Sequence, residues 1–173
     1  MSGPAPRAVP FEGSEVRIIR SPRRRKTAQA RMVGGVLEVR VPSGIPAAEE
    51  QRLVEHFRQR LDRTRRSGQV DLGARAAHLA RAHDLPEPAE IRWVANQEHR
   101  WGSCTPARGV VRISDRLASF PPWVLDYVVV HELAHLIEPS HSAAFWTLVA
   151  RYPLAERARG YLMAKGMEEP DAV

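Results

Sequence analysis

Two histidines four residues apart, in the pentad His131-Glu132-Leu133-Ala134-His135, are the residues of this sequence best suited to chemistry. In a helix, residues four apart lie on one face about 6 Å from each other, so both imidazoles can bind one ion. Zinc takes nitrogen ligands at about 2.0 to 2.1 Å in a tetrahedral arrangement. It therefore needs a further protein ligand and leaves one position for water. The pentad predicts one zinc ion held by His131 and His135.

Glu132 follows the first histidine and stays near the same helix face. There it can hydrogen-bond a metal-bound water, whose pKa the metal lowers towards about 7, and take its proton. Glu132 is therefore the predicted catalytic general base of a hydrolase. The oxyanion formed in such a reaction needs another donor, for which Arg100, Arg112 and Tyr127 are the candidates; the sequence does not choose among them.

His141 is the best candidate for the third ligand. Pro139 disfavours helical geometry at Glu138 and turns the chain back just beyond the second ligand. The interval from His135 to His141 is six residues, as in the metzincin pattern, although that pattern has Gly at the position of Glu138. Glu138 and Glu156 are the alternative ligands, Glu156 because other zincins recruit a carboxylate from a later helix.

A pentad of this kind can also occur without a metal, as a helix face with hydrogen-bonded histidines and a paired glutamate. Here apolar residues surround it, from Val128 to Val130 before it and at Leu136 and Ile137 after it. Burying two imidazoles and a carboxylate in such a segment costs free energy unless a metal compensates them. The context therefore favours a metal site.

A second unusual cluster is His99-Arg100-Trp101-Gly102-Ser103-Cys104. Arg100 could stabilise an oxyanion or a phosphate, and Trp101 could line a cleft; alternatively, Trp101 and Cys104 are core residues. Cys104 has no basis for a role as nucleophile, since the zinc site already supplies one. The residues that we assign tentatively to substrate binding are Arg100, Trp101, Arg112 and Tyr127.

The elements that must position these residues are predicted from hydrophobic periodicity and turn signals. The pentad lies in a long apolar segment, 123–137, that Pro121-Pro122 opens and that should be a buried helix. Ser140 or Ser142 could cap a further helix that contains Phe145 and Trp146, and residues 154–163 could form the last one. Upstream, residues 47–66 and 71–83 read as amphipathic helices.

Short β-branched segments predict the strands. Residues 15–20 and 36–41 resemble strands of a hairpin or meander, with a turn at Gly34-Gly35, and residues 90–95 and 110–114 predict a small antiparallel sheet. Residues 110–114 could be an edge strand that pairs with an extended substrate, or one that the protein covers itself. The expected fold class is α+β.

At 173 residues the chain is long enough for one hydrophobic core, so we expect a single domain. The expected division is a flexible N-terminus at 1–14, one metallohydrolase domain at 15–167 and a tail at 168–173. Within the domain we expect an N-terminal β region at 15–45 and a catalytic core at 90–165. One cysteine excludes an internal disulfide and favours a reducing compartment. No apolar run suggests a signal peptide or a membrane span, so the predicted location is the cytoplasm.

Positive charge is concentrated in the first part of the chain. The net charge is +6, and residues 1–70 hold 15 basic against 7 acidic residues, with the densest basic run at 23–26. Such an excess suggests polyanionic partners, for example nucleic acid or nucleotides. It is equally a feature of chains that use arginine as their ordinary solvated cation, as the 24 Arg and 2 Lys here suggest.

Several motifs taken together resemble the YgjP-like metallopeptidase family, which is similar to the SprT-like zincins. They are Arg100-Trp101-Gly102-Ser103-Cys104, Pro121-Pro122, Tyr127 to His135, His141-Ser142-Ala143-Ala144-Phe145-Trp146 and the basic segment from Ser21 to Thr27. The resemblance implies a zincin-like core with an added N-terminal β region, and zinc on His131, His135 and His141. The family often has Asn at the position of Ser140 and near Ser114 and Asp115, so substrate preference does not carry over.

The leading hypothesis is a zinc-dependent hydrolase that acts on a peptide or protein substrate. A second hypothesis keeps the metal and changes the substrate to a nucleotide phosphoanhydride, because arginines suit phosphate. A third is a basic, nucleic-acid-associated module with a structural zinc site. Its binding should weaken steeply with salt.

Overall fold

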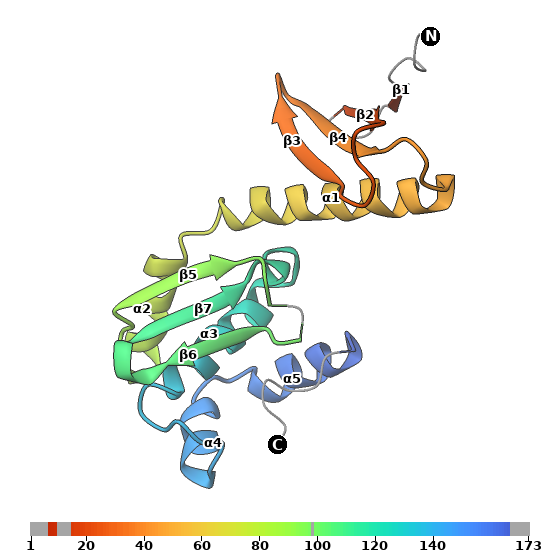
Figure 1. The fold of residues 1–173 in the computed structure, drawn as a ribbon. Coiled ribbons are helices and arrows are strands. Elements are labelled where there is room, and N and C mark those ends of the chain that lie inside the picture. Colours follow the sequence, from red (N-terminus) through yellow and green to blue (C-terminus); the bar gives the residue numbers. More distant parts are fainter. Residues whose placement is uncertain (1–6, 10–14, 98, 167–173) are drawn as a thin grey trace. The chain divides into compact units, whose positions relative to one another are not determined.

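Helices and short strands occupy separate stretches of the chain, which confirms the α+β class that the sequence predicts (Figure 1). The computed structural model describes residues 7–9, 15–97 and 99–166. The chain divides into two compact units, Met1–Asp62 and Arg63–Val173, with the boundary inside helix α1 (Ala47–Ser67). The expectation that 15–167 form a single domain stays a prediction, because a division into compact units does not measure whether they unfold together.

The first unit is a sheet packed on one helix. Its strands are β1 (Arg7–Val9), β2 (Val16–Ser21), β3 (Gln29–Val33) and β4 (Val36–Pro42), in the order β1-β2-β4-β3. Strand alternation puts Leu37, Val39 and Val41 on the face that packs against apolar residues of α1. Residues 7–9, within the segment 1–14 for which the sequence predicts flexibility, form β1, and the rest of that segment lies outside the described residues, as does the tail 168–173.

The hairpin predicted between residues 15–20 and 36–41 is wrong. These segments, β2 and β4, pair in parallel, and β4 forms its hairpin with β3 instead. The turn lies at Gly34 and Gly35, as predicted, and both have positive φ. The intervening strand β3 was not predicted because its residues are mostly exposed and show no apolar alternation.

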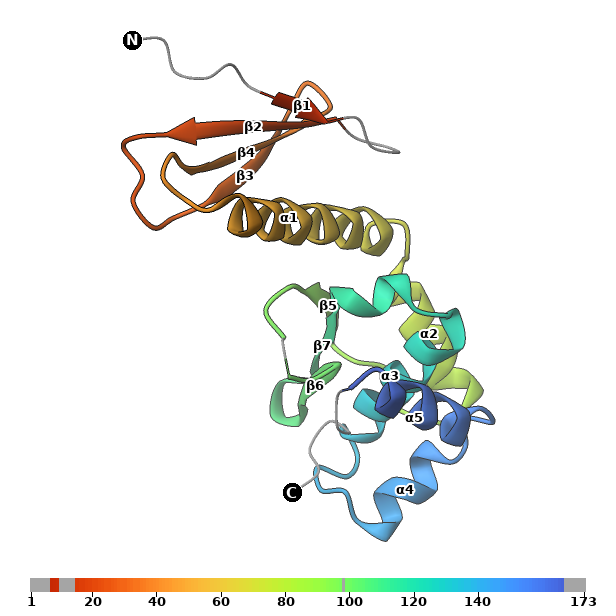
Figure 2. The ribbon, with the colours of Figure 1, turned by 90° about the vertical axis from the view of Figure 1, so that its right-hand side faces the viewer.

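The second unit places one helix between a sheet and other helices. The sheet consists of β5 (Glu90–Val94), β6 (Gly102–Thr105) and β7 (Val110–Ser114), in the order β5-β7-β6. Helix α3 (Pro122–Ala134) contacts β6 and β7, and also α2 (Leu72–Ala82), α4 (Ala143–Val149) and α5 (Ala155–Ala164) (Figure 2). Because α3 is enclosed in this way, it is apolar all round, as the sequence predicts for a buried helix.

The small sheet is mixed rather than antiparallel. β5 and β7 run parallel because β6, which lies between them in the chain and was not predicted, reverses direction and pairs antiparallel with β7. The strand at 110–114 is therefore central and not an edge strand, so it cannot pair with a substrate. The edge of the sheet next to β7 is formed by β6, which also contacts α3.

No helix among residues 7–9, 15–97 and 99–166 is long and apolar enough to cross a membrane. The cytoplasmic location, inferred from the single cysteine and from the apolar pattern of the sequence, stays a prediction.

Candidate metal centre

The structure brings together three imidazoles from the end of α3 and the turn that follows it. His131 lies in the last turn of α3, His135 is the C-cap residue, and the chain then turns back so that His141 lies directly before α4. One nitrogen from each ring lies within 4.8 Å of the others. Nε2 of His131 and Nε2 of His141 are 3.2 Å apart. Two nitrogens bound to one tetrahedral zinc ion would be about 3.3 to 3.4 Å apart, so the spacing of this pair fits that ion.

Hydrogen bonding orients one of these rings. Nδ1–H of His135 donates to the carbonyl oxygen of Glu138 at 3.1 Å, because a carbonyl can only accept. This fixes the tautomer, so that Nε2 of His135 carries no proton, the usual arrangement of a metal-binding histidine. Nδ1 of His131 is buried with no hydrogen-bond partner in the described part of the chain, so other contacts must hold that ring.

Burial keeps the central ring neutral. His131 is almost completely buried. Desolvation lowers its pKa well below the ordinary 6.5, and the nearby His135 and His141 lower it further. A neutral imidazole is the form that binds a metal.

Two aromatic residues of α4 pack on the imidazoles. Ser142 is the N-cap of α4 and accepts from the backbone N–H of Phe145, which confirms one of the two predicted caps. The Phe145 ring stacks on His135 at 4.3 Å between centroids and meets His131 edge-on at 4.8 Å. Trp146 stacks on His141 at 5.6 Å. The sequence placed both in a helix and in a motif of the family resemblance but assigned them no role at the metal site, although their position shortly after His141 was a usable signal.

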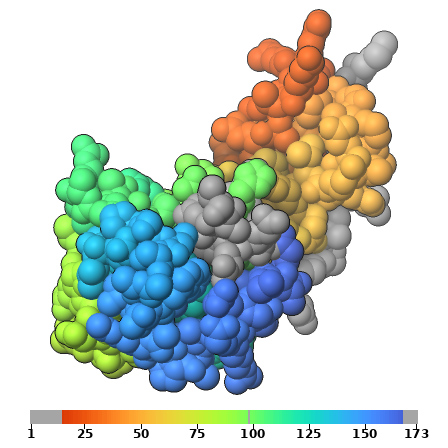
Figure 3. Space-filling model, turned by 90° about the horizontal axis from the view of Figure 1, so that it is seen from below, coloured from red at the N-terminus to blue at the C-terminus, as the bar shows by residue number. Residues whose placement is uncertain are grey.

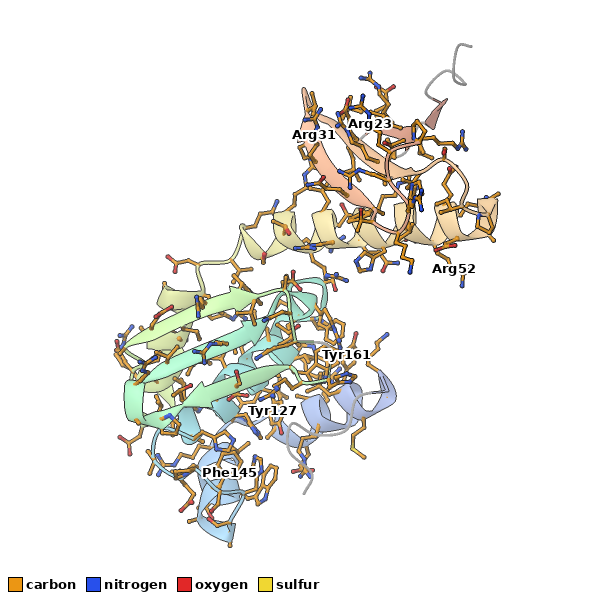
Figure 4. All side chains as sticks on the ribbon, viewed as in Figure 1. Arg23, Arg31, Arg52, Tyr127, Phe145 and Tyr161 are labelled. Carbon is orange, nitrogen blue, oxygen red and sulfur yellow. The ribbon has the colours of Figure 1, made fainter. Side chains whose placement is uncertain are left out.

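The labelled side chains of Phe145 and Tyr127 both belong to the second unit (Figure 4). Helices α4 and α5, blue in Figure 3, lie on one face of that unit. Between them, the Arg159 guanidinium lies 4.8 Å from the centroid of the Trp146 ring. A cation over an indole face is attractive and helps to fix Trp146 against the histidine cluster.

The Glu132 carboxylate is buried and faces β6. A Cβ atom added to Gly102 would lie only 2.4 Å from Oε1 of Glu132. Burial and the nearby Glu132 raise the pKa of the Cys104 thiol to about 11. The thiol is therefore neutral near pH 7, which agrees with the prediction that Cys104 is not a nucleophile.

The two alternative ligands lie outside the histidine cluster. Glu138 has an exposed side chain that accepts from the backbone N–H and the hydroxyl of Ser140, and these bonds lower the pKa of its carboxyl. Glu156 is largely exposed and forms an ion pair with Arg159. The carbonyl of Glu138, rather than its carboxylate, is what contacts the cluster.

The four tentative substrate residues are in different surroundings. Trp101 is buried against Phe120 and under the guanidinium of Arg116, which favours the core alternative. Tyr127 is also buried. Their roles in substrate binding stay predictions.

The two arginines among them differ from each other. Arg112 alternates with the buried Val111 and Ile113 and so lies on the face of the sheet opposite α3, where it donates to Thr105. Arg100 is exposed and lies two residues before the start of β6. Of the candidates, Arg100 is therefore the one whose position leaves it accessible to a substrate.

Much of the positive charge of the first unit is already paired. Arg17, Arg31 and Arg40 all lie within 4.0 Å of Glu38, and Arg20 forms a bidentate pair with Glu50. The exposed cations Arg23, Arg25 and Lys26 form no ion pair with another described residue. Arg23 is labelled near Arg31 in Figure 4.

Comparison with known proteins supports the resemblance that the motifs indicate. Residues 6–164 match the sequence model of the YgjP-like, metallopeptidase domain family. Among solved structures, the metallopeptidase zymogen abylysin of Pyrococcus abyssi is similar over 56% of this chain and 95% of its own, with 19% identity and a TM-score of 0.49. None of the curated proteins matches the chain significantly.

Proposed function

The chain belongs to the YgjP-like metallopeptidase family, and from this we propose that it is a zinc peptidase in which His131, His135 and His141 hold the metal and Glu132 is the general base. Membership makes it a metal-dependent hydrolase of the peptidase class; zinc, the ligand set and the role of Glu132 are the proposal. The convergence of three imidazoles within 4.8 Å is the observation that carries it.

The donor set fits zinc better than the other common catalytic ions. Magnesium and calcium prefer oxygen ligands, whereas neutral imidazole suits zinc and related transition metals. Three protein ligands leave one open position, as catalytic zinc sites require. Zinc bound there would supply Lewis acidity and lower the pKa of a water molecule to about 7.

The residues of the chain supply orientation and proton transfer. Glu132 takes the proton of the attacking water and returns it to the leaving amine, since it lies one residue beyond His131 and is itself buried beside the histidine cluster. The carbonyl of Glu138 keeps Nε2 of His135 available, and Phe145 holds the rings in place. Strand β6 is an edge strand beside Glu132, so we propose that an extended peptide lies along it.

A Glu132→Gln variant tests the mechanism. We expect zinc content to stay at the wild-type level, because Glu132 is not a ligand, while kcat on a casein-type substrate falls by about 10²- to 10⁴-fold. Glu156→Gln is the matched control and should behave as wild type, because Glu156 is exposed and outside the cluster. Unchanged hydrolysis by the Glu132→Gln variant would show that another group is the base.

The phosphoanhydride alternative is tested with the same proteins. Family membership favours the peptide substrate. Arg112, a candidate oxyanion donor in the sequence, lies on the sheet face opposite α3. We expect zinc-loaded protein to hydrolyse the casein-type substrate and to leave a panel of nucleoside triphosphates intact. Hydrolysis of the nucleotides alone would reverse this assignment.

The exposed cations at 23–26 support one second candidate function, docking of nucleic-acid phosphates. Arg23, Arg25 and Lys26 form no ion pair within the described residues, so their charge is available to a partner. Replacing these three by Ser should reduce the salt dependence of binding to a DNA duplex. Binding of the wild type that does not change with salt would exclude this surface as a phosphate site.

A further inference from the structure

We propose that Gly102 is a positioning residue for Glu132: the absence of a side chain at Gly102 creates the space that the catalytic carboxylate occupies. This inference rests on the proposed function, because it assigns a purpose to the place where the general base lies. It also gives a physical reason for the glycine of the Arg100 to Cys104 motif, which the sequence alone left without one.

The first step is steric. A Cβ atom at Gly102 would lie 2.4 Å from Oε1 of Glu132 and 2.8 Å from both its Cγ and its Cδ. Carbon–carbon contacts are favourable only near 3.5 to 4.0 Å. Because Cγ is too close as well as the carboxylate, rotating the end of the side chain does not relieve the overlap. An alanine at 102 therefore requires the Glu132 side chain to move.

The second step excludes a backbone reason for the glycine. Gly102 is not among the glycines with positive φ, which are Gly34, Gly35, Gly109 and Gly166 in the described part of the chain. It lies inside β6 and pairs with Ile113 of β7. At such a position alanine is allowed and normally stabilises a strand relative to glycine. The need for glycine is therefore a need for space.

The third step comes from the alternation of β6. Gly102 and Cys104 are two residues apart, so they share the face of the sheet on which Val111 and Ile113 are buried. That face packs against α3. Only the residue without a side chain leaves room on this face for the carboxylate of a neighbouring helix.

The fourth step concerns the consequence of displacement. Glu132 is 2% exposed and belongs to the last turn of α3, so a side chain pushed away from β6 cannot simply swing into solvent. It has to move within the site, along the face that carries the metal ligands. A misplacement of about 1 Å can reduce the rate about 10²-fold.

The experiment compares Gly102→Ala with Gly160→Ala in the full-length, zinc-loaded protein. Gly160 lies in α5, and a Cβ there meets nothing within 4 Å, so it is the matched control for the same chemical change. We expect Gly102→Ala to keep its zinc and to lower kcat by about 10²-fold with KM within about two-fold. Gly160→Ala should keep wild-type kinetics. Wild-type kcat in a folded, zinc-loaded Gly102→Ala protein would overturn the proposal.

A second pair of variants covers the case in which Gly102→Ala fails to fold or loses zinc. Glu132→Asp shortens the side chain by one methylene and removes part of the overlap. Gly102→Ala is then introduced both into the wild type and into the Glu132→Asp variant. The loss of kcat, or of soluble zinc-loaded protein, should be at least about ten-fold smaller in the Glu132→Asp variant than in the wild type. Equal costs in both backgrounds mean that Gly102 does not act through Glu132, and the proposal fails.

These outcomes are separate from failure of the proposed function. If Glu132→Gln hydrolyses substrate normally, Glu132 is not the base whatever Gly102 does. If Glu132→Gln is inactive and Gly102→Ala is normal, the mechanism stands and only the positioning role is lost.

Discussion

Glu38 in the first unit and Glu132 in the second are both buried carboxylates, 7% and 2% exposed, but their neighbours differ in kind. Glu38 accepts two hydrogen bonds from Arg31, at 3.0 and 3.1 Å, and has Arg17 and Arg40 within 4.0 Å. Glu132 faces Gly102 of β6, has the Cys104 thiol of the same strand nearby, and follows His131, one of the three clustered histidines, in α3.

The difference shows that burial alone does not identify a functional carboxylate. Three guanidiniums lie around Glu38, and Arg31 donates two hydrogen bonds to it, which is how a buried charge is made structurally acceptable. Glu132 instead lies beside three clustered histidines, where the proposed function makes it the general base. The kind of neighbour therefore separates the two roles.

The largest expected effect is that of removing one of the proposed metal ligands beside Glu132. Losing a residue that only supports a metal ligand costs up to about 100-fold in metal affinity, so losing a ligand itself should cost more. We therefore expect His135→Ala to reduce zinc affinity by more than about 100-fold and hydrolysis to fall to the uncatalysed level. Metal analysis after dialysis and a peptidase assay measure this. His83→Ala is the control, because His83 packs on Tyr152 away from the cluster. If His135→Ala retained stoichiometric zinc, the surroundings of Glu132 would not be a metal site.

The next effect concerns the aromatic packing that holds the imidazoles. Phe145 is completely buried and contacts all three rings, so Phe145→Ala should lower the free energy of unfolding by about 3 to 5 kcal/mol. Urea denaturation of the metal-free protein gives this value. Phe145→Leu keeps most of the volume and should lose less. Equal losses for the two variants would contradict a packing role.

Acid should weaken the metal-free protein through His131. In the unfolded chain its imidazole takes a proton below the ordinary pKa of 6.5, whereas the buried ring resists protonation until well below that pH. The unfolded state then binds more protons, so stability is full above pH 6.5 and falls as the pH decreases from there, by up to about 1.4 kcal/mol per pH unit.

Urea denaturation at several pH values below 6.5 measures this slope. His131→Gln removes the titrating group and should flatten it. The same slope in both proteins would mean that His131 is not the source of the acid sensitivity.

The sequence predicted the elements around Glu132 better than those around Glu38. The pentad, the buried helix that carries it and the turn at Pro139 all depend on short-range patterns, such as residues four apart and the restriction before proline. The two missed strands, β3 and β6, are short, and their pairing depends on partners elsewhere in the chain.

The contacts that distinguish the two carboxylates are also long-range. Gly102 meets Glu132 across 30 positions of the sequence, and no local pattern states that a glycine and a carboxylate will touch. The arginines around Glu38 come from three strands: the parallel β2–β4 pairing brings Arg17 to Glu38 and the β3–β4 pairing brings Arg31, and the sequence predicted neither pairing. Composition showed the excess of arginine without showing that much of it is paired.

The smallest expected effect is that of replacing Glu38, and it tests whether this carboxylate has a structural role alone. Glu38→Gln removes the charge that three guanidiniums share, but those side chains are 39–56% exposed and can turn to water. Solvent screening therefore limits the loss to about 1 to 2 kcal/mol of unfolding free energy.

The control is Glu15→Gln, at an exposed glutamate just before β2, which should change the unfolding free energy little. Zinc content and kcat should equal those of the wild type, because Glu38 serves only to hold the sheet together. A fall in kcat like that of Glu132→Gln would show that the two carboxylates cannot be told apart by their neighbours.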